Sequence, residues 1–308
     1  MQNSKVDLTR IRGIGPVTAE KLAEAGFATV EKIAVAPARL IAEILGIAEE
    51  RAAEITRAAR EIIGLKFMTA EEYFEAREQV AYVTTGCRAL DDLLGGGVET
   101  GAVTELVGEF GTGKTQLCHQ LCVTVQLPRE EGGLEAGAVY IDTEGTFRPE
   151  RIVQMASRFS LEPRKALRNI LYARARNKAE QLALIIEAEK LVREKIRMVI
   201  LDGIAAFFSG GRNGNAKVVR EMLIHLSRLR VLARKHNLAV IITNHVVSKP
   251  GIVEKMPFGD PYTAVIVDTR VFLYKVRETL RRAETVFGAP AGSTVFSIAE
   301  NGVVDLTF

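Results

Sequence analysis

Cysteine, tryptophan and long apolar runs are scarce in this chain of 308 residues. Its three cysteines are too few, and odd in number, for a disulfide scaffold, so we expect a reducing, cytoplasmic setting. Cys118 and Cys122 are four residues apart, and two thiols do not make a zinc site, so we assign both to the core. No apolar run reaches the roughly 18–20 residues of a membrane helix, and the N-terminus lacks the apolar stretch of a signal peptide. The sequence therefore predicts a cytoplasmic protein that does not enter a membrane.

A strong charge of either sign is also lacking. The formal net charge is +3, which is too small to indicate nucleic-acid binding by itself. Hydrophobic residues make up 47% of the chain, so it can bury a substantial core. The length suits one large domain plus a small one.

Three segments differ in their residue patterns. Residues 1–62 are rich in Ala, Glu and Arg and predict short helices, one of them opened by Pro16 and ended by Gly26. Residues 63–80 form a connecting segment. From residue 81 onward, short β-rich runs alternate with helical stretches such as 179–195 and 216–236. We therefore predict an all-α domain over 1–62, a linker, and an α/β core over 81–308.

The alternation in the core predicts a mostly parallel sheet covered by helices. The runs that read as its strands are "AVTELVG", "AVYIDTE", "NILYARA", "RMVILDG" and "LAVIITNH". The tail, 270–308, reads as antiparallel strands that close this sheet.

A glycine-rich loop follows the first of these strands. Residues 108–115, "GEFGTGKT", fit the pattern G-x-x-x-x-G-K-[ST], with a strand before and a helix after. Glycines let backbone N–H groups turn toward phosphate oxygens, and the helix N-terminus adds positive potential. Lys114 can reach the β- and γ-phosphates, and the Thr115 hydroxyl suits Mg²⁺. A purely structural turn is the weaker interpretation.

Polar residues also end three other strands, at the edge of the sheet where ligands bind. Asp202 ends "RMVILD" and suits a magnesium partner, although it could be a strand cap. Glu144 lies past a strand in a Gly-containing turn, so it is a better candidate than Asp142 for orienting an attacking water. Asn244 and His245 could contact the γ-phosphate, and His245 could equally cap its strand.

The chain resembles the archaeal RadA recombinases, relatives of bacterial RecA and of the eukaryotic strand-exchange proteins. The resemblance is densest over residues 5–205. It rests on "GIGPVTAEKL", "FMTAEEYFEAR", "YIDTEGTFRPERI" and the long stretch around the glycine-rich loop. It implies an N-terminal helix-hairpin-helix domain, a RecA-like P-loop ATPase core, and filaments on single-stranded DNA with ATP and Mg²⁺.

The same resemblance implies roles for individual residues. Lys114 and Thr115 hold phosphate and Mg²⁺, Asp202 supports the metal, and Glu144 polarises the water. Arg151 lies near the adenine. The whole nucleotide loop would comprise Gly108, Glu109, Phe110, Gly111, Thr112, Gly113, Lys114, Thr115 and Gln116.

Phe67 and Ala70, in "FMTA", match the self-association motif of the family, in which the Phe fills a pocket on the next subunit. An apolar anchor on a linker can add an edge strand to a neighbour's sheet, giving a filament or ring, or docking on a partner recombinase. The other possibility is that Phe67 packs within its own chain.

Two regions are implied to bind DNA. In the helix-hairpin-helix domain, Gly13 and Gly15 would expose N–H groups to the phosphates of duplex DNA without reading sequence. In the first DNA loop of the core, "SGGRNGNAKVVRE", the only cations are Arg212, Lys217 and Arg220.

The second half of the chain departs from the family pattern. Gly203 replaces a Ser, and His245 replaces the Gln that senses the γ-phosphate. The second DNA loop, within 246–269, is shorter than in the family. The segment 287–293, which in the family caps ATP from the adjoining subunit, has no carboxylate here. We therefore expect a recombinase. The alternative is a paralog that binds ATP and a partner recombinase and assists loading without efficient strand exchange.

Overall fold

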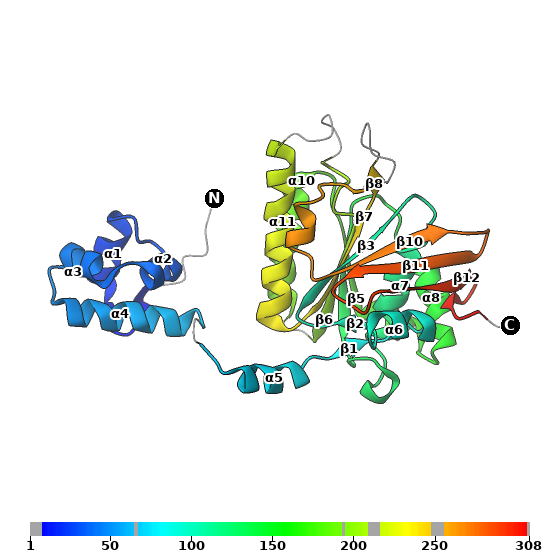
Figure 1. Cartoon of the computed structure of the whole chain (residues 1–308), viewed down its shortest axis with the longest axis horizontal. Helices are drawn as coiled ribbons and strands as arrows, with labels where there is room; N and C mark the ends of the chain where they lie inside the picture. Colours follow the sequence, from blue (N-terminus) through cyan, green and yellow to red (C-terminus); the bar gives the residue numbers. More distant parts are fainter. Residues whose placement is uncertain (1–7, 65–66, 193–194, 209–215, 248–255, 307–308) are drawn as a thin grey trace. The chain divides into compact units, whose positions relative to one another are not determined.

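The chain forms two compact units, 1–77 and 78–308, each of which is described by itself. Figure 1 shows the computed structural model, which describes residues 8–64, 67–192, 195–208, 216–247 and 256–306. Within the described residues, no helix is long and apolar enough to cross a membrane.

The N-terminal unit is a cluster of short helices around its own core. Pro16 opens α1, and the side chain of Thr29 accepts a hydrogen bond from the backbone of Lys32 at the start of α2. The fully buried side chains include Ile11, Leu22 and Ile33. The elements are η1 Leu8–Arg10, α1 Pro16–Glu24, α2 Val30–Val35, α3 Ala38–Leu45 and α4 Glu49–Ile62.

Helix α5, Ala70–Glu78, lies in the segment predicted to be a linker, and none of its residues is buried. A capping box fixes its start. The backbone N–H of Thr69 donates to Glu72 Oε2 at 2.6 Å, and that of Glu72 donates to Thr69 Oγ1 at 3.0 Å. Local hydrogen bonds, rather than packing, therefore define this helix.

The core is built on a nine-stranded sheet with the order β13-β12-β11-β10-β3-β7-β6-β4-β5. Neighbouring strands are parallel in the part β10-β3-β7-β6-β4-β5. They are antiparallel in the part β13-β12-β11-β10. The predicted mostly parallel α/β core and its antiparallel tail are thus confirmed. The strands are β3 Ala102–Gly108, β4 Gly137–Asp142, β5 Ile170–Arg174, β6 Ile196–Asp202, β7 Ala239–Asn244, β10 Thr269–Lys275, β11 Leu280–Phe287, β12 Gly292–Ala299 and β13 Gly302–Val304.

Helices cover both faces of the parallel part (Figure 1). One apolar layer contains α6 Arg88–Leu94, α7 Lys114–Thr124, α8 Pro149–Arg158 and α9 Pro163–Arg168. The other contains α10 Lys178–Leu191 and α11 Ala216–His236. Cys118 and Cys122 are fully buried in the first layer, as predicted. The short elements are β1 Tyr82–Val83, β2 Val98–Glu99, η2 Arg129–Glu131, β8 Val246–Val247, β9 Met256–Pro257 and η4 Thr263–Val265.

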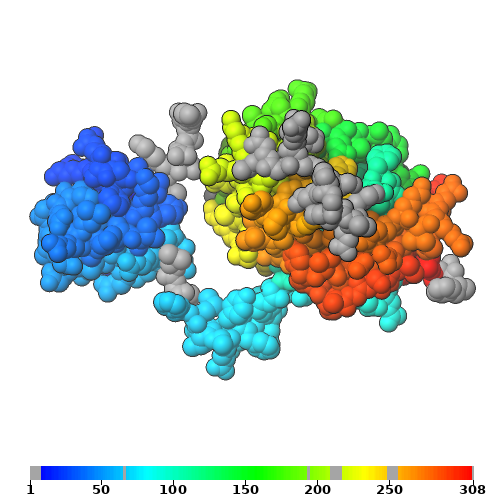
Figure 2. Space-filling view, turned by 45° about the horizontal axis from the view of Figure 1, so that its top comes forward, coloured from blue at the N-terminus to red at the C-terminus, as the bar shows by residue number. Residues whose placement is uncertain are grey.

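Among the described residues, the antiparallel strands have one face packed against the first apolar layer and one face more open. In Figure 2, the orange and red residues of the C-terminal strands lie open at the surface of the core. Tyr274 and Val286 are exposed there, whereas Val271 and Ala283 face the buried layer. This alternation is typical of antiparallel strands with one solvated face.

Candidate functional site

The glycine-rich loop joins β3 to α7 at the carboxyl edge of the sheet. A Cβ on Gly108 would lie 2.5 Å from the carbonyl oxygen of Leu273 and 2.6 Å from Thr112 Oγ1. Gly113 has a φ of 102°, which only glycine adopts readily, and it immediately precedes the first residue of α7. Glycine is therefore required at both positions for the backbone to turn into the helix.

Lys114 extends back along this loop. Its Nζ donates hydrogen bonds to the carbonyl oxygens of Gly108, at 2.8 Å, and Glu109, at 2.9 Å. Burial lowers the pKa of the ammonium, and the nearby carboxylates of Asp202 and Glu144 oppose this shift. The ammonium group is thus held at the loop by two backbone carbonyl oxygens.

Asp202, at the end of β6, accepts hydrogen bonds from hydroxyl groups on neighbouring strands and on α7. Its carboxylate accepts hydrogen bonds from Thr115 Oγ1 at 2.8 Å, Tyr140 OH at 2.6 Å and Thr243 Oγ1 at 2.6 Å. Only 3% of Asp202 is exposed, so hydrogen bonds replace the lost water around its charge. The predicted metal residues Thr115 and Asp202 are therefore adjacent.

Asp142 and Glu144 have different surroundings. The carboxylate of Asp142 is buried and accepts hydrogen bonds from the backbone N–H groups of Glu144, Gly145 and Phe147. These bonds fold the turn that follows β4 and leave the side chain of Glu144 partly exposed at the site. Asp142 therefore shapes the turn, and the side chain of Glu144 takes no part in these bonds.

His245 lies next to Glu144. Its Nε2 is 2.7 Å from Glu144 Oε1, although the two residues are 101 positions apart in the sequence. The pKa of the Glu144 carboxyl is lowered, mainly by the hydrogen bond from His245 and further by the charges of Lys114 and Arg174. The sequence alone predicted that His245 contacts the γ-phosphate or caps its strand, and it did not predict this pairing.

Arg151, near the start of α8, links the nucleotide loop to the C-terminal strands. Its Nε donates to Gln116 Oε1 at 2.9 Å, and its other nitrogens reach the carbonyl oxygens of Ala299 and Glu300. Gln116 is thereby fixed in the first turn of α7. A planar cation is thus held beside this end of the loop.

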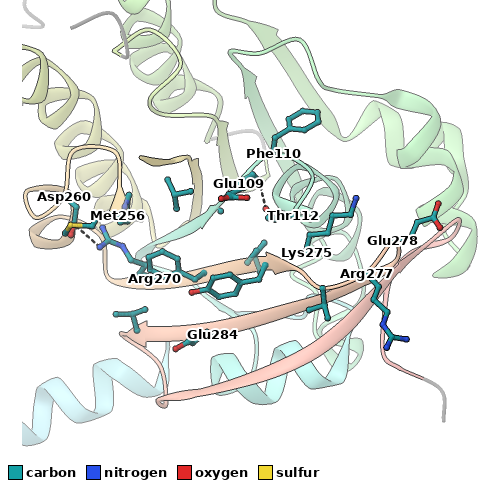
Figure 3. A pocket seen from close by; sticks show the side chains of 18 residues that line it. Glu109, Phe110, Thr112, Met256, Asp260, Arg270, Lys275, Arg277, Glu278 and Glu284 are labelled. Carbon is teal, nitrogen blue, oxygen red and sulfur yellow. Dashed lines mark hydrogen bonds and ion pairs between the residues drawn. The ribbon is translucent and has the colours of Figure 1, made fainter. Parts of the chain in front are cut away.

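A cavity of about 1170 Å³ adjoins the glycine-rich loop, but Lys114, Glu144 and Asp202 do not line it. It is lined by loop residues 108–110 and Thr112 and by the open face of β10 and β11 (Figure 3). Phe110 is 91% exposed and stands at the edge of the cavity in Figure 3. Gly111 has a φ of 76°, and no atom lies within 4 Å of where its Cβ would be. The loop residues Glu109 and Phe110 are therefore both exposed where the loop borders this cavity.

The other predicted residues lie away from this site along the chain. Phe67 is fully exposed, and Ala70 begins α5. Gly13 and Gly15 lie in the turn before α1, and the φ of Gly13 is 96°. Lys217 and Arg220 are exposed in the first turns of α11, and Arg212 lies outside the described residues.

Two residues of the site, Tyr140 and Thr243, were not predicted from the sequence, and both bind Asp202. Asp142 was a candidate, but its role in folding the turn of Glu144 was not predicted. The period-2 pattern of a strand offered one signal, because Tyr140 and Asp142 share a face of β4 and each carries a polar group. Nothing in the linear sequence indicated that Thr243 would lie beside Asp202.

Comparisons with known proteins agree with this geometry. The family model described as Rad51 matches residues 76–306, and the one described as a SAM-like helix-hairpin-helix tandem matches residues 5–61.

Proteins described as "DNA repair and recombination protein RadA" match nearly the full length. The one from Aeropyrum pernix is 43% identical, with 97% of each chain covered. Those from Metallosphaera sedula and Ignicoccus hospitalis are each 42% identical, covering 96% and 97% of this chain and 94% and 95% of theirs.

Proposed function

The chain belongs to the Rad51 family, among the RadA proteins, and on this basis we propose that it is an ATP-dependent DNA recombinase. It would form filaments on single-stranded DNA and exchange strands during homologous recombination and repair. The observation that carries this proposal is the match to proteins named for recombination over 96–97% of the chain. A cytoplasmic location, expected from the sparse cysteines, stays a prediction.

The residues of the loop fit ATP and Mg²⁺. Glycines at 108 and 113 leave space where side chains would block the backbone, and Lys114 supplies charge. Thr115 and Asp202 offer hard oxygen ligands, which suit Mg²⁺. Among the described residues, no three His, Cys, Asp or Glu side chains gather around one point, so the phosphates would complete the shell. Arg151 would lie along the adenine.

Hydrolysis would depend on Glu144. A bound Mg²⁺ would neutralise charge that develops on the phosphates. The partly exposed carboxylate of Glu144, held by the turn that Asp142 folds, would accept a hydrogen bond from the attacking water and so orient it. We therefore assign the chain a DNA-dependent ATPase activity, with Lys114 and Glu144 as catalytic residues.

Self-association would depend on Phe67. The side chain has 106% relative exposure, and α5, which follows it, buries nothing. The sheet of the core ends at β5, whose outer edge has no neighbouring strand among the described residues. A second copy could pair its linker with this edge and insert Phe67 among side chains near the exposed Leu171 and Ile186.

DNA would contact both units. Gly13 and Gly15 expose backbone in the N-terminal unit, where Arg10, Arg12 and Lys21 are exposed nearby. In the core, the exposed cations Lys217 and Arg220 lie at the start of α11. Arg212, the third predicted cation, lies outside the described residues. These contacts would neutralise phosphates without reading bases.

The alternative of a loading paralog is not favoured, because the full-length relatives carry the recombinase name. A strand-exchange assay, run beside a single-strand-stimulated ATPase assay, tests the proposal. We expect ATP-dependent joint molecules and stimulated hydrolysis, with both lost in Lys114→Ala. Normal ATP hydrolysis without strand exchange, unless a partner recombinase is added, would instead support the paralog.

A further inference from the structure

His245 and Glu144 meet at the site from different strands. Glu144 follows β4, and His245 follows β7, where its Nε2 lies 2.7 Å from Glu144 Oε1. The side chain of His245 is 38% exposed and that of Glu144 is 31% exposed. Both side chains are therefore partly open to solvent, and neither is held in place by burial alone.

The carboxylate of Glu144 determines which group donates this hydrogen bond. A carboxylate only accepts hydrogen bonds, so Nε2 of His245 must carry the hydrogen. This holds for the neutral ring in that tautomer as well as for the imidazolium, so the bond does not depend on the charge of the histidine. Glutamine, the residue that the family pattern has here, would offer a similar N–H donor from its amide.

The backbone on both sides of His245 is anchored. Its carbonyl oxygen accepts a hydrogen bond from Phe258 N at 2.9 Å. The preceding residue, Asn244, is buried and donates to Glu105 Oε1 at 2.8 Å and to the carbonyl oxygen of Phe258 at 3.0 Å. The imidazole therefore projects from a fixed base, and its hydrogen bond can restrain Glu144.

Glu144 has few other restraints on its side chain. Its backbone is held by Asp142, but among the described residues its Oε2 has no hydrogen-bonding partner. A Cβ at position 203 would lie 3.4 Å from Oε1, so even a small side chain there would contact the carboxylate in this orientation. The titratable and charged groups that face Glu144 are His245, which follows β7, Lys114 from α7 and Arg174 from β5.

We propose that His245 is a positioning residue that holds Oε1 of Glu144, so that Oε2 is presented to the attacking water. The inference rests on the proposed ATPase function, and it differs from direct recognition of the γ-phosphate by the histidine. The partner that His245 contacts is the group that orients water, and this contact requires no nucleotide.

Two substitutions separate positioning from nucleotide binding. At saturating ATP with Mg²⁺ and single-stranded DNA, His245→Ala should lower kcat roughly ten- to hundredfold, because a misplaced carboxylate orients water poorly. The KM for ATP should change by less than about threefold, a small binding effect. His245→Gln should restore most of kcat, since the amide can donate to Oε1.

The pH profile provides a readout that a merely structural role would not move. His245 lowers the pKa of Glu144, so the carboxylate stays ionised to lower pH in the wild type. The acid limb of kcat against pH should therefore move to higher pH in His245→Ala. In the Glu144→Gln background, His245→Ala should cause no further loss of kcat, since the two residues act as a unit.

A measurement without nucleotide completes the test. In wild-type protein with ¹⁵N-labelled histidine, the Nε2 resonance of His245 should be that of a protonated nitrogen, and it should shift in Glu144→Gln. An Nε2 resonance without a proton, or one unmoved by Glu144→Gln, would overturn the inference.

The kinetic outcomes are equally decisive. An unchanged or higher kcat in His245→Ala, a raised KM with unchanged kcat, or additive losses in the double variant would each overturn the positioning role while leaving the ATPase intact. Absence of hydrolysis by the wild-type chain would instead remove the proposed function itself.

Discussion

The site around Asp202 and the segment 67–78 differ in how much the rest of the chain contacts them. Around Asp202, four elements contribute hydroxyl groups or charges that bind one another, and the carboxylate is 3% exposed. Along 67–78, Phe67 is fully exposed and α5 buries no residue. The first region is organised within one chain, whereas the second presents apolar surface that a monomer leaves in water.

This difference separates the properties of one copy from those of an assembly. In a preorganised polar site, little of the binding free energy is lost to ordering the groups when a ligand arrives. An exposed phenylalanine gains its favourable transfer energy only when something covers it. Substitutions in the two regions should therefore affect different measurements.

The largest effect is expected from Lys114→Ala. It removes the cation from the loop while leaving its glycines, so ATP hydrolysis measured by phosphate release should fall to background. The exposed Lys165 provides a matched control, and Lys165→Ala should leave turnover unchanged. Normal hydrolysis in Lys114→Ala would refute the assignment of the loop.

Glu144→Gln should come next. The amide keeps the shape of the side chain but is a poor acceptor for a proton, so turnover should fall about 10²–10⁴-fold. Binding of ATP with Mg²⁺, followed by calorimetry, should be retained because Lys114, Thr115 and Asp202 are untouched. A variant that hydrolyses ATP normally would show that another residue orients the water.

Phe67→Glu tests the other region. A charge placed in an apolar pocket would cost a few kcal/mol, so assemblies should give way to monomers in light scattering. Phe74→Glu is the matched control, because Phe74 is also exposed, at 67%, but lies outside the "FMTA" motif. Equal size distributions for Phe67→Glu and the wild type would remove Phe67 as the anchor.

His119, one of the buried histidines of the core, gives a pH test of stability. Burial lowers the pKa of His119 from 6.5 to about 4. The unfolded chain therefore binds a proton that the folded chain refuses between these values, so stability should fall as the pH is lowered through this window. The loss is about 3 kcal/mol from this group.

His119→Gln should reduce this slope when the free energy of unfolding is measured by denaturant titration at several pH values. The amide oxygen can still accept the hydrogen bond that Arg148 N donates to His119 Nε2 at 3.1 Å. Identical slopes for the two proteins would show that His119 does not limit stability in acid.

The smallest effect is expected in the N-terminal unit. Arg12→Glu should weaken binding of the full chain to duplex DNA modestly and reduce the salt dependence by about one phosphate contact. Arg39→Glu, an exposed charge on α3, serves as the control. Binding that does not depend on salt in the wild type would argue against phosphate contacts by this unit.

The fold could be read from the sequence because its signals are local. Short β-rich runs that end in polar residues and alternate with helical stretches predicted β3, β4, β6 and β7 as strands of a parallel sheet. The pattern of residues 270–308 predicted the antiparallel strands. The capping box of α5, Thr69 with Glu72, is a local sequence pattern of the same kind, although its segment was predicted only as a linker.

The contacts within the site could not be read in this way. Thr243 lies beside Asp202, and His245 beside Glu144, because strand order and register bring residues together that are distant in sequence. Predicting them requires the order of β4, β6 and β7, which hydrophobic periodicity does not give. The departure from the family pattern at His245 was visible, but its partner was not.

The most direct test of the contrast between the two regions is the affinity of monomeric Phe67→Glu for ATP. Binding of ATP with Mg²⁺ would be measured by calorimetry at concentrations where sedimentation shows single copies. If the nucleotide site is complete in one chain, the dissociation constant should stay within about threefold of the wild type. A folded monomer whose affinity falls more than about tenfold, or a variant that still assembles, would contradict the account.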